Sequence, residues 1–358
     1  MSASPRPRAT PGLARHASRP YHTPSTGVFA LLPQFLVPWA ELMHLNQPEG
    51  YLAFYWHYAI GLAFAACIAA PHPPPLSAFI TIAGYLSVWV FIFRGAVCTW
   101  NDILDEVFDW KATRTQLRPL SRGALSMAQA QIFLLLQVIL LGILLIPLST
   151  ACLIYADIMA MVFAINPLVK RMTHFSPFVL GAGFAVPILM SCAAFRADPL
   201  LQALLGMDLD EDENEGSRAS SAYLVGAACL YLASLLTTVI FESIFAHQNI
   251  KDDLKTGVRS LALYLGPRAK QWLSFLASIQ VCLTLAVGFS CGFSLLYYTI
   301  SCGGLAISLA SLLYFVDLTS PASCALVFRQ GSIAVGLTLT IGLLAEYMYR
   351  SLLSIAGE

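Results

Sequence analysis

The stretch "WNDILDEVFDW", residues 100–110, gathers acidic side chains directly after an apolar segment. Its oxygen-bearing side chains are Asn101, Asp102, Asp105, Glu106 and Asp109. If the apolar helix continues through Asp109, all of them except Glu106 fall on one stripe about 100° wide. Carboxylates at the C-terminal end of a helix oppose its dipole and repel one another, so a bound cation is expected there. The alternative is an acidic turn exposed to water.

A second acidic segment, "FESIFAHQNIKDDLKTGVRSLALYLG", spans residues 241–266. On a helical wheel, Glu242, Asn249 and Asp253 fall within about 40° of one another. The spacing N-x-x-x-D occurs in both acidic segments, and a basic segment containing glycine follows each of them. This pattern favours an internal repeat whose two halves face each other across a helical bundle.

Oxygen ligands beside basic residues are typical of a polyanion bridged by metal. Mg²⁺ commonly joins one or two carboxylates to substrate phosphates, and Lys or Arg neutralises the remaining charge. Because the acidic segments adjoin apolar spans, the organic part of such a phosphate should itself be apolar, as in an isoprenyl diphosphate. The basic candidates for binding the diphosphate are Lys111, Arg114, Arg118, Lys170, Arg171 and Lys251.

The composition predicts the elements that must hold these groups. The chain is 58% hydrophobic and 11% charged, with a mean hydropathy of +0.70, whereas soluble domains carry about 25% charged residues. We therefore expect an all-α integral membrane protein with nine helices in the lipid bilayer and no nucleic-acid partner. The predicted spans are 51–70, 77–100, 128–147, 149–166, 176–195, 221–245, 271–291, 293–315 and 332–354.

Charge along the chain predicts its orientation and its parts. Lys and Arg occur in the connections after spans two, four and six, which places those connections and the N-terminus in the cytosol. The predicted parts are a disordered basic tail at 1–27, an interfacial helix at 28–48 and the transmembrane domain at 49–358, with an acidic loop at 207–220. The acid-free tail suits either a mitochondrial transit peptide or a cytosolic tail, so an endomembrane such as the endoplasmic reticulum is favoured and the mitochondrial inner membrane stays open.

Three blocks in this order resemble the UbiA-type intramembrane prenyltransferase superfamily. Residues 94–126 resemble its N-D-x-x-D-x-x-x-D motif, residues 166–177 its Y-P-x-x-K-R loop, and residues 246–266 its second acidic motif. The resemblance covers about residues 42–270. It implies the nine-helix fold of that family, with Mg²⁺-dependent transfer of an isoprenyl group from its diphosphate to an aromatic acceptor. The relatives it suggests are 4-hydroxybenzoate polyprenyltransferases and fungal prenyltransferases of meroterpenoid pathways.

Several positions depart from the family pattern. Glu242 and Asn249 stand where the family usually has Asp, Asn166 replaces a Tyr, and the N-terminal R-x-x-K-P pattern reads "HLNQP" from His44. An amide at position 249 offers an oxygen without charge and should weaken binding of a second Mg²⁺. These departures favour a specialised relative over the ubiquinone-pathway enzyme. The expected function is transfer of a farnesyl-like group in meroterpenoid or other secondary-metabolite biosynthesis.

The resemblance implies roles for the acidic and neighbouring residues, some of which have alternatives. The expected metal ligands are Asn101, Asp102, Asp105, Asp109, Glu242, Asn249 and Asp253, among which Asp102, Asp105, Asp109 and Asp253 are the expected catalytic residues. His44, Arg94 and Trp100 are candidates for the acceptor pocket, each with a structural or interfacial alternative. The connections 110–126 and 250–268 are expected to close as a lid that excludes water. The competing functions are an intramembrane terpene cyclase and a cation-coupled transporter.

Overall fold

A computed structural model describes residues 27–69, 72–110, 115–205, 215–250, 253–254 and 259–357. It has two compact units, which we describe separately. Unit 1 comprises Met1–Pro48 and Ile92–Leu140, and unit 2 comprises Glu49–Phe91 and Leu141–Glu358. Over the described residues the secondary structure is helical, and nine helices are long and apolar enough to cross a membrane. The predicted all-α fold with nine membrane helices is confirmed.

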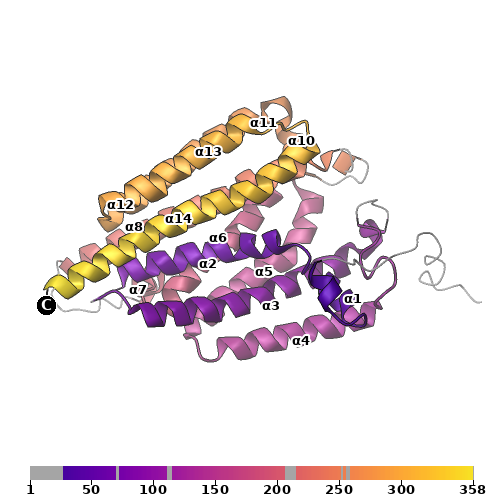
Figure 1. Cartoon of the computed structure of the whole chain (residues 1–358), viewed down its shortest axis with the longest axis horizontal. Helices are drawn as coiled ribbons and strands as arrows, with labels where there is room; N and C mark the ends of the chain where they lie inside the picture. Colours follow the sequence, from indigo (N-terminus) through magenta and orange to yellow (C-terminus); the bar gives the residue numbers. More distant parts are fainter. Residues whose placement is uncertain are drawn as a thin grey trace, which may run out of the picture. The chain divides into compact units, whose positions relative to one another are not determined.

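The long helices follow the predicted spans (Figure 1). They are α2 (Pro48–Ile68), α3 (Leu76–Asp109), α4 (Met127–Leu145), α5 (Thr150–Met172), α6 (Ser176–Ala194), α8 (Glu215–His247), α11 (Ala269–Cys291) and α14 (Pro321–Gly357). The eighth span, Leu295–Phe315, ends with α13 (Gly304–Phe315). Shorter helical elements are η1 (Val28–Leu31), α1 (Val37–Leu42), α7 (Pro199–Leu205), α10 (Leu261–Leu265), η2 (Gly266–Arg268), α12 (Leu295–Tyr297) and the π-helical η3 (Tyr298–Gly303).

Several helices are longer than the apolar runs that predicted them, and α3 and α14 show the largest differences. α3 continues past the predicted end at residue 100 as far as Asp109, as the stripe of oxygen ligands required. α14 begins at Pro321, well before the predicted start at residue 332. Hydropathy underestimates both lengths because helix formation tolerates polar residues at its ends, and proline suits the first helical turn.

The segment 28–48, which we expected to form one interfacial helix, contains two short ones. η1 ends at Leu31, and Leu32 is extended (φ −98°, ψ 144°) before Pro33. A residue that precedes proline is pushed out of the helical region, so the chain cannot continue as one helix. Within unit 1, Leu42 of α1 is fully buried in a cluster with Leu120, Leu125 and Ala130. Residues 1–26 of the predicted tail and 206–214 of the acidic loop lie outside the described residues.

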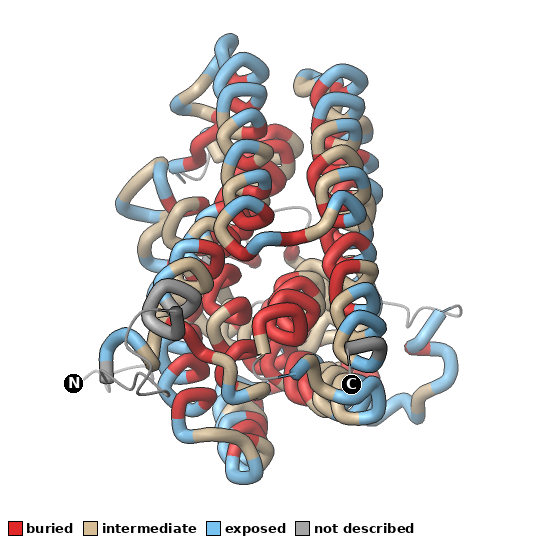
Figure 2. Tube along the Cα trace, turned by 90° about the vertical axis from the view of Figure 1, so that its left-hand side faces the viewer, coloured by how far each residue is buried: buried red, intermediate tan, exposed pale blue. Residues whose placement is uncertain are grey.

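Unit 2 contains the larger hydrophobic core. α8 packs against α6, α11 and α14, and α13 lies beside α14 (Figure 1). Buried side chains from separate helices meet there, among them Phe64, Ile188 and Leu230. Buried and exposed positions occur along the same helices (Figure 2). Many of the exposed residues are apolar, with Phe289 86% exposed, as expected of faces that contact lipid tails.

A buried ion pair in unit 2 joins the ends of three helices. The Glu346 carboxylate, 1% exposed, accepts hydrogen bonds from Arg350 Nε at 2.8 Å and from the Ser294 backbone N–H at 2.9 Å. The rest of the Arg350 guanidinium donates to the backbone oxygens of Cys67 on α2 and Cys291 on α11. Every charge in this group is compensated and the last carbonyls of two helices gain donors, so we assign it a structural role.

Candidate active site

The acidic stripe of unit 1 lies on the last turns of α3. Residues 96–109 contain no glycine or proline, and the helix runs unbroken to Asp109. Thr115 Oγ1 then donates to the backbone oxygen of Asp109 at 3.0 Å, which supplies a partner for one of the last carbonyls of the helix. The same threonine accepts the backbone N–H of Arg118 at 2.9 Å. This turn therefore positions Arg118 beside the end of α3.

Arg118 joins two carboxylates of the stripe. Its Nη1 donates to Asp102 Oδ1 at 2.8 Å and to Asp109 Oδ2 at 2.6 Å. The two aspartates are seven residues apart, which places them on the same helix face two turns from each other. The Asp102 side chain is 1% exposed and that of Arg118 is 25% exposed. Sequence alone assigned Arg118 to the diphosphate, and the structure brings it to the carboxylates of the stripe.

The ionisation of these groups follows from their burial and their charges. Burial raises the pKa of Asp109, and the neighbouring Arg118 opposes this rise. Burial also disfavours the charged guanidinium, but Asp102 and Asp109 outweigh it and raise the pKa of Arg118. Arg118 is therefore a permanent cation, and it compensates charges that would otherwise repel each other at a helix end.

A turn after α1 brings His44 to the same stripe. His44 Nε2 lies 3.3 Å from Asp102 Oδ1, and the backbone of His44 is left-handed (φ 52°). Arg94, 5% exposed on α3, donates to the backbone oxygens of Met43, His44 and Gln47 at 3.0–3.1 Å. Arg94 thus stabilises a strained turn through its carbonyls. Trp100, the third candidate for the acceptor pocket, is partly buried on α3.

The stripe suits a magnesium ion bound together with phosphate. Asn101 Oδ1 is buried and has no hydrogen-bond partner in the described part of the chain, which is unusual for a buried amide oxygen. It is one turn of helix from Asp105. Over the described residues, no three carboxylate, imidazole or thiol groups converge into a complete metal site. Mg²⁺ commonly takes one or two carboxylates and fills its remaining positions with water and phosphate oxygens.

The second acidic segment, in unit 2, differs from the single helix assumed by the helical wheel. α8 ends at His247, and two turn residues follow, so the wheel geometry for Glu242, Asn249 and Asp253 is wrong. The cause lies in the last turn, where Asn249 N–H bonds to Ala246 O, a tighter i→i+3 contact. Beyond the break, Asp253 N–H donates to Asn249 O at 2.9 Å, which keeps these two candidate ligands one turn apart.

Two of the sequence blocks meet in unit 2. Lys170 and Arg171 occupy the last turn of α5, where cations favour the helix dipole. Arg259, after the second acidic segment, donates its backbone N–H to Lys170 O at 3.3 Å and its Nη1 to Met172 O at 2.7 Å. Lys170 also acts electrostatically on Glu242. The order of the blocks in the sequence does not predict this contact. Lys111, Arg114 and Lys251 lie outside the described residues.

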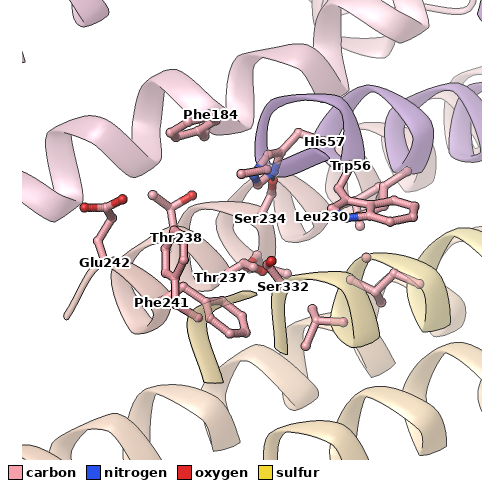
Figure 3. Close-up of a pocket in the computed structure, with 17 residues that line it drawn as sticks. Trp56, His57, Phe184, Leu230, Ser234, Thr237, Thr238, Phe241, Glu242 and Ser332 are labelled. Atoms are coloured by element: carbon pink, nitrogen blue, oxygen red, sulfur yellow. Dashed lines mark hydrogen bonds between the residues drawn. The ribbon is translucent and has the colours of Figure 1, made fainter. Parts of the chain in front are cut away.

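Glu242 lies at one end of an apolar pocket within unit 2 (Figure 3). Helices α2, α6, α8 and α14 line this pocket, and its walls surround about 670 Å³, part of which is open at the mouth. Trp56 and Leu230 lie at the other end of the close-up, with His57 and Ser234 between. The lining residues belong to the first, fifth, sixth and ninth membrane spans.

Most polar side chains in the pocket wall are bonded within the protein. His57 Nδ1 lies 2.5 Å from Ser234 Oγ, Thr237 Oγ1 donates to Ala233 O, and Ser332 Oγ donates to Arg329 O. These pairings leave a largely apolar surface toward the pocket. Sequence analysis named none of these residues, although a histidine within an apolar span, as at position 57, is a signal that could have marked the site.

The fold and these side chains define a class of protein: a multi-pass membrane protein in which acidic and basic groups at helix ends accompany an apolar pocket. A comparison with known protein families identifies the family within this class. The model of the UbiA prenyltransferase family matches residues 58–340, and the chain belongs to this family. It is accordingly a prenyltransferase, that is, a transferase, and the resemblance seen in the sequence is confirmed.

Relatives from two kinds of pathway are similar to the chain. The prenyltransferase ascA of Acremonium egyptiacum is 32% identical over 82% of this chain and 81% of its own length. The mitochondrial 4-hydroxybenzoate polyprenyltransferase of Drosophila melanogaster is 30% identical over 88% of this chain and 72% of its own length. Both names describe the transfer of a prenyl or polyprenyl group.

A solved structure has the same fold. A UbiA homolog from Archaeoglobus fulgidus, bound to GPP and Mg²⁺, superimposes with a TM-score of 0.60 at 15% sequence identity. The match covers 86% of this chain and 99% of that one. At this identity the likeness concerns the fold, and the ligands are those of the archaeal protein.

Proposed function

We propose that this protein transfers an isoprenyl group of farnesyl-like length from its diphosphate to a carbon of an aromatic or phenolic acceptor, with Mg²⁺ as cofactor. The observation that carries the proposal is the pocket of unit 2, which has a carboxylate at one end and a largely apolar wall. An isoprenyl diphosphate has the same division into a charged head and an apolar chain. The Mg²⁺ and GPP of the archaeal homolog support the same class of substrate.

Both acidic segments contribute metal ligands in this proposal. On α3, the proposed ligands are the carboxylates of Asp102, Asp105 and Asp109 and the buried, unpartnered side-chain oxygen of Asn101. In unit 2, the proposed ligands are Glu242, Asn249 and Asp253. When bound, Mg²⁺ would neutralise the diphosphate and stabilise the charge of the departing pyrophosphate. Lys170 and Arg171 share that charge, as do Lys111, Arg114 and Lys251, while Arg118 pairs with Asp102 and Asp109 and orients them.

In this proposal the charged groups promote cleavage of the diphosphate, and the pocket protects the resulting cation from water. Heterolysis of the bond between the allylic carbon and the diphosphate oxygen yields an allylic cation and pyrophosphate. The cationic side chains stabilise the leaving oxygens, and the apolar pocket wall excludes water that would convert the cation to an alcohol. An aromatic carbon of the acceptor then forms the new C–C bond and loses its proton to a carboxylate base. Phe184 and Phe241 line the pocket, and aromatic rings can stabilise a developing cation.

The residues of the site favour a specialised aromatic acceptor over 4-hydroxybenzoate. His44 stands where the family pattern has a basic residue, and its imidazole is held against Asp102 at 3.3 Å. A permanent cation at this position would attract a carboxylate-bearing acceptor, which a histidine does less strongly. We therefore favour a meroterpenoid or another secondary-metabolite pathway. The name of the insect relative points to 4-hydroxybenzoate, the acceptor of the ubiquinone pathway. This compound is therefore the competing acceptor to test.

The test is a transfer assay with membranes that contain the full chain. Farnesyl and geranylgeranyl diphosphate are supplied with Mg²⁺ and a panel of phenolic acids that includes 4-hydroxybenzoate. The variant Asp105→Ala removes a stripe carboxylate, and Glu106→Ala removes its neighbour, which lies off the stripe. We expect a prenylated aromatic product that requires Mg²⁺ and Asp105 and survives the Glu106 substitution.

Other outcomes would replace the proposal. Release of pyrophosphate with only hydrocarbon or alcohol products would indicate a terpene cyclase. Exclusive use of 4-hydroxybenzoate with long polyprenyl diphosphates would indicate the ubiquinone pathway. Equal activity of Asp105→Ala and the unaltered chain would remove the stripe from the catalytic site.

The protein is an integral membrane protein, and we propose an endomembrane such as the endoplasmic reticulum as its location. The basic connections and the active site would then face the cytosol, as the positive-inside rule predicts. Fractionation of cells that express a tagged chain tests this location. Co-purification with mitochondrial inner membrane would overturn it and favour the transit-peptide interpretation of the N-terminal tail.

A further inference from the structure

Trp56 is the largest side chain at the end of the pocket that lies away from Glu242. Trp56 of α2 and Leu230 of α8 lie there, whereas Thr238 lies between them and Glu242 (Figure 3). Leu230 and Glu242 are twelve residues apart on the same helix, which corresponds to a depth of about 18 Å. A chain whose charged head lies near Glu242 therefore extends toward the Trp56 indole.

Gly336 determines where the Trp56 indole lies. A Cβ atom added at Gly336 of α14 would lie 2.3 Å from Trp56 Cδ2, 2.4 Å from Cγ and 2.8 Å from Cδ1. Real Cβ atoms do not approach other atoms so closely, so the ring occupies the space that a side chain at position 336 would need. Any larger residue there must move the indole. Both residues line the pocket, so such a movement changes the volume of the pocket.

No hydrogen bond fixes the indole in the described part of the chain. Trp56 Nε1 is buried and has no hydrogen-bond partner there, whereas His57, its neighbour in sequence, is bonded to Ser234. A buried indole N–H usually finds an acceptor. The position of the ring is therefore set by packing, and the ring occupies the space beside Gly336. A change at either of the two residues alters the size of the pocket without removing any hydrogen bond.

We propose that Trp56, held against Gly336, sets the longest isoprenyl chain that the pocket accepts. This rests on the proposed function, because it assigns the pocket to the prenyl chain of the diphosphate. It predicts opposite effects at the two positions. Trp56→Leu removes ring volume at the end of the pocket and admits longer chains. Gly336→Ala moves the indole and restricts the pocket to shorter chains.

The test compares geranyl, farnesyl and geranylgeranyl diphosphate as substrates of the full chain in membranes. The readout is the ratio of kcat/KM for the longer and the shorter diphosphates. We expect Trp56→Leu to raise this ratio about tenfold and Gly336→Ala to lower it by a similar factor, the usual size of a steric effect in an apolar pocket. In the double variant the Ala at position 336 meets no indole, so the ratio returns toward that of Trp56→Leu. Gly142→Ala, with nothing within 4 Å of an added Cβ, is the matched control.

A binding measurement separates this inference from the proposed function. Thermal stabilisation of the detergent-purified chain by each diphosphate with Mg²⁺ requires no acceptor. If the length preference shifts in binding while no aromatic product forms, the inference holds and the proposed transfer to an aromatic acceptor fails. An unchanged length preference in folded Trp56→Leu overturns the inference, as does an equal loss for all lengths. Should Gly336→Ala fail to fold, Trp56→Leu decides alone.

Discussion

Arg118 and Asp102 form an ion pair at 2.8 Å in which the aspartate side chain is 1% exposed. The same guanidinium nitrogen lies 2.6 Å from Asp109. One cation therefore compensates two carboxylates on the last turns of α3. This ion pairing offsets part of the cost of negative charge in a place where burial and the helix dipole both disfavour it.

Removing Arg118 should damage both stability and activity. Arg118→Ala leaves two carboxylates uncompensated, which we expect to cost up to about 3 kcal/mol, because the guanidinium is partly exposed. Arg118→Lys should retain part of both properties, since a single ammonium is a poorer bridge between two carboxylates. Thermal unfolding in detergent and product formation measure the two effects. Arg329→Ala, an exposed arginine of α14, is the control. Unchanged stability and activity in Arg118→Ala would show that the bridge is dispensable.

Arg94 should act through the turn that carries His44. Its guanidinium bonds only to the backbone oxygens of residues 43, 44 and 47 among the contacts of the described chain. Arg94→Ala should therefore reduce transfer activity strongly in the unaltered chain and weakly in a His44→Ala background. A double-mutant cycle on kcat/KM measures this coupling. Additive losses would indicate that Arg94 acts independently of His44, as a direct contact to the acceptor would.

Asn249→Asp should lower the Mg²⁺ concentration needed for half-maximal activity. The substitution adds a negative charge to an oxygen donor, and charged oxygen ligands bind Mg²⁺ more tightly. Titration of activity with Mg²⁺ at saturating diphosphate provides the measurement. Asp253→Asn should shift the midpoint in the opposite direction. A midpoint that does not move in Asn249→Asp would remove this residue from the metal site.

Asp317 should make the stability of the link between α13 and α14 depend on pH. Its carboxylate accepts hydrogen bonds from Thr319 Oγ1 at 2.7 Å and Thr319 N–H at 2.9 Å, and these bonds lower the pKa of Asp317. A depressed folded-state pKa contributes stability above the unfolded value, near pH 4, and that stability is lost as the pH falls through the folded pKa. The advantage of the unaltered chain over Asp317→Ala in thermal unfolding should therefore shrink between pH 5 and about pH 3. An advantage that is constant over this range would contradict the assignment.

The helices and the acidic stripe could be predicted from local properties. Long apolar runs must form helices in lipid because no water is available to the backbone, and this requirement operates within each run. The absence of glycine and proline between residues 96 and 109 lets α3 continue beyond its apolar part. The predicted span 221–245 ends close to the end of α8 at His247, but the helical wheel that continued this helix to Asp253 was wrong, because the break depends on competing hydrogen bonds of the last turn.

The sequence by itself determined that the chain is a nine-span membrane protein of the UbiA type with oxygen ligands at the end of α3, because hydrophobicity and motif spacing are encoded within single segments. Only the tertiary structure decided which groups compensate that charge and what surrounds the pocket. Arg118 reaches Asp102 across a turn. Trp56 lies against Gly336, although the two residues are far apart in the sequence. Such contacts depend on how helix faces pack against one another. Packing is set by the shapes of many side chains together, and the spacing of residues along one segment does not encode it.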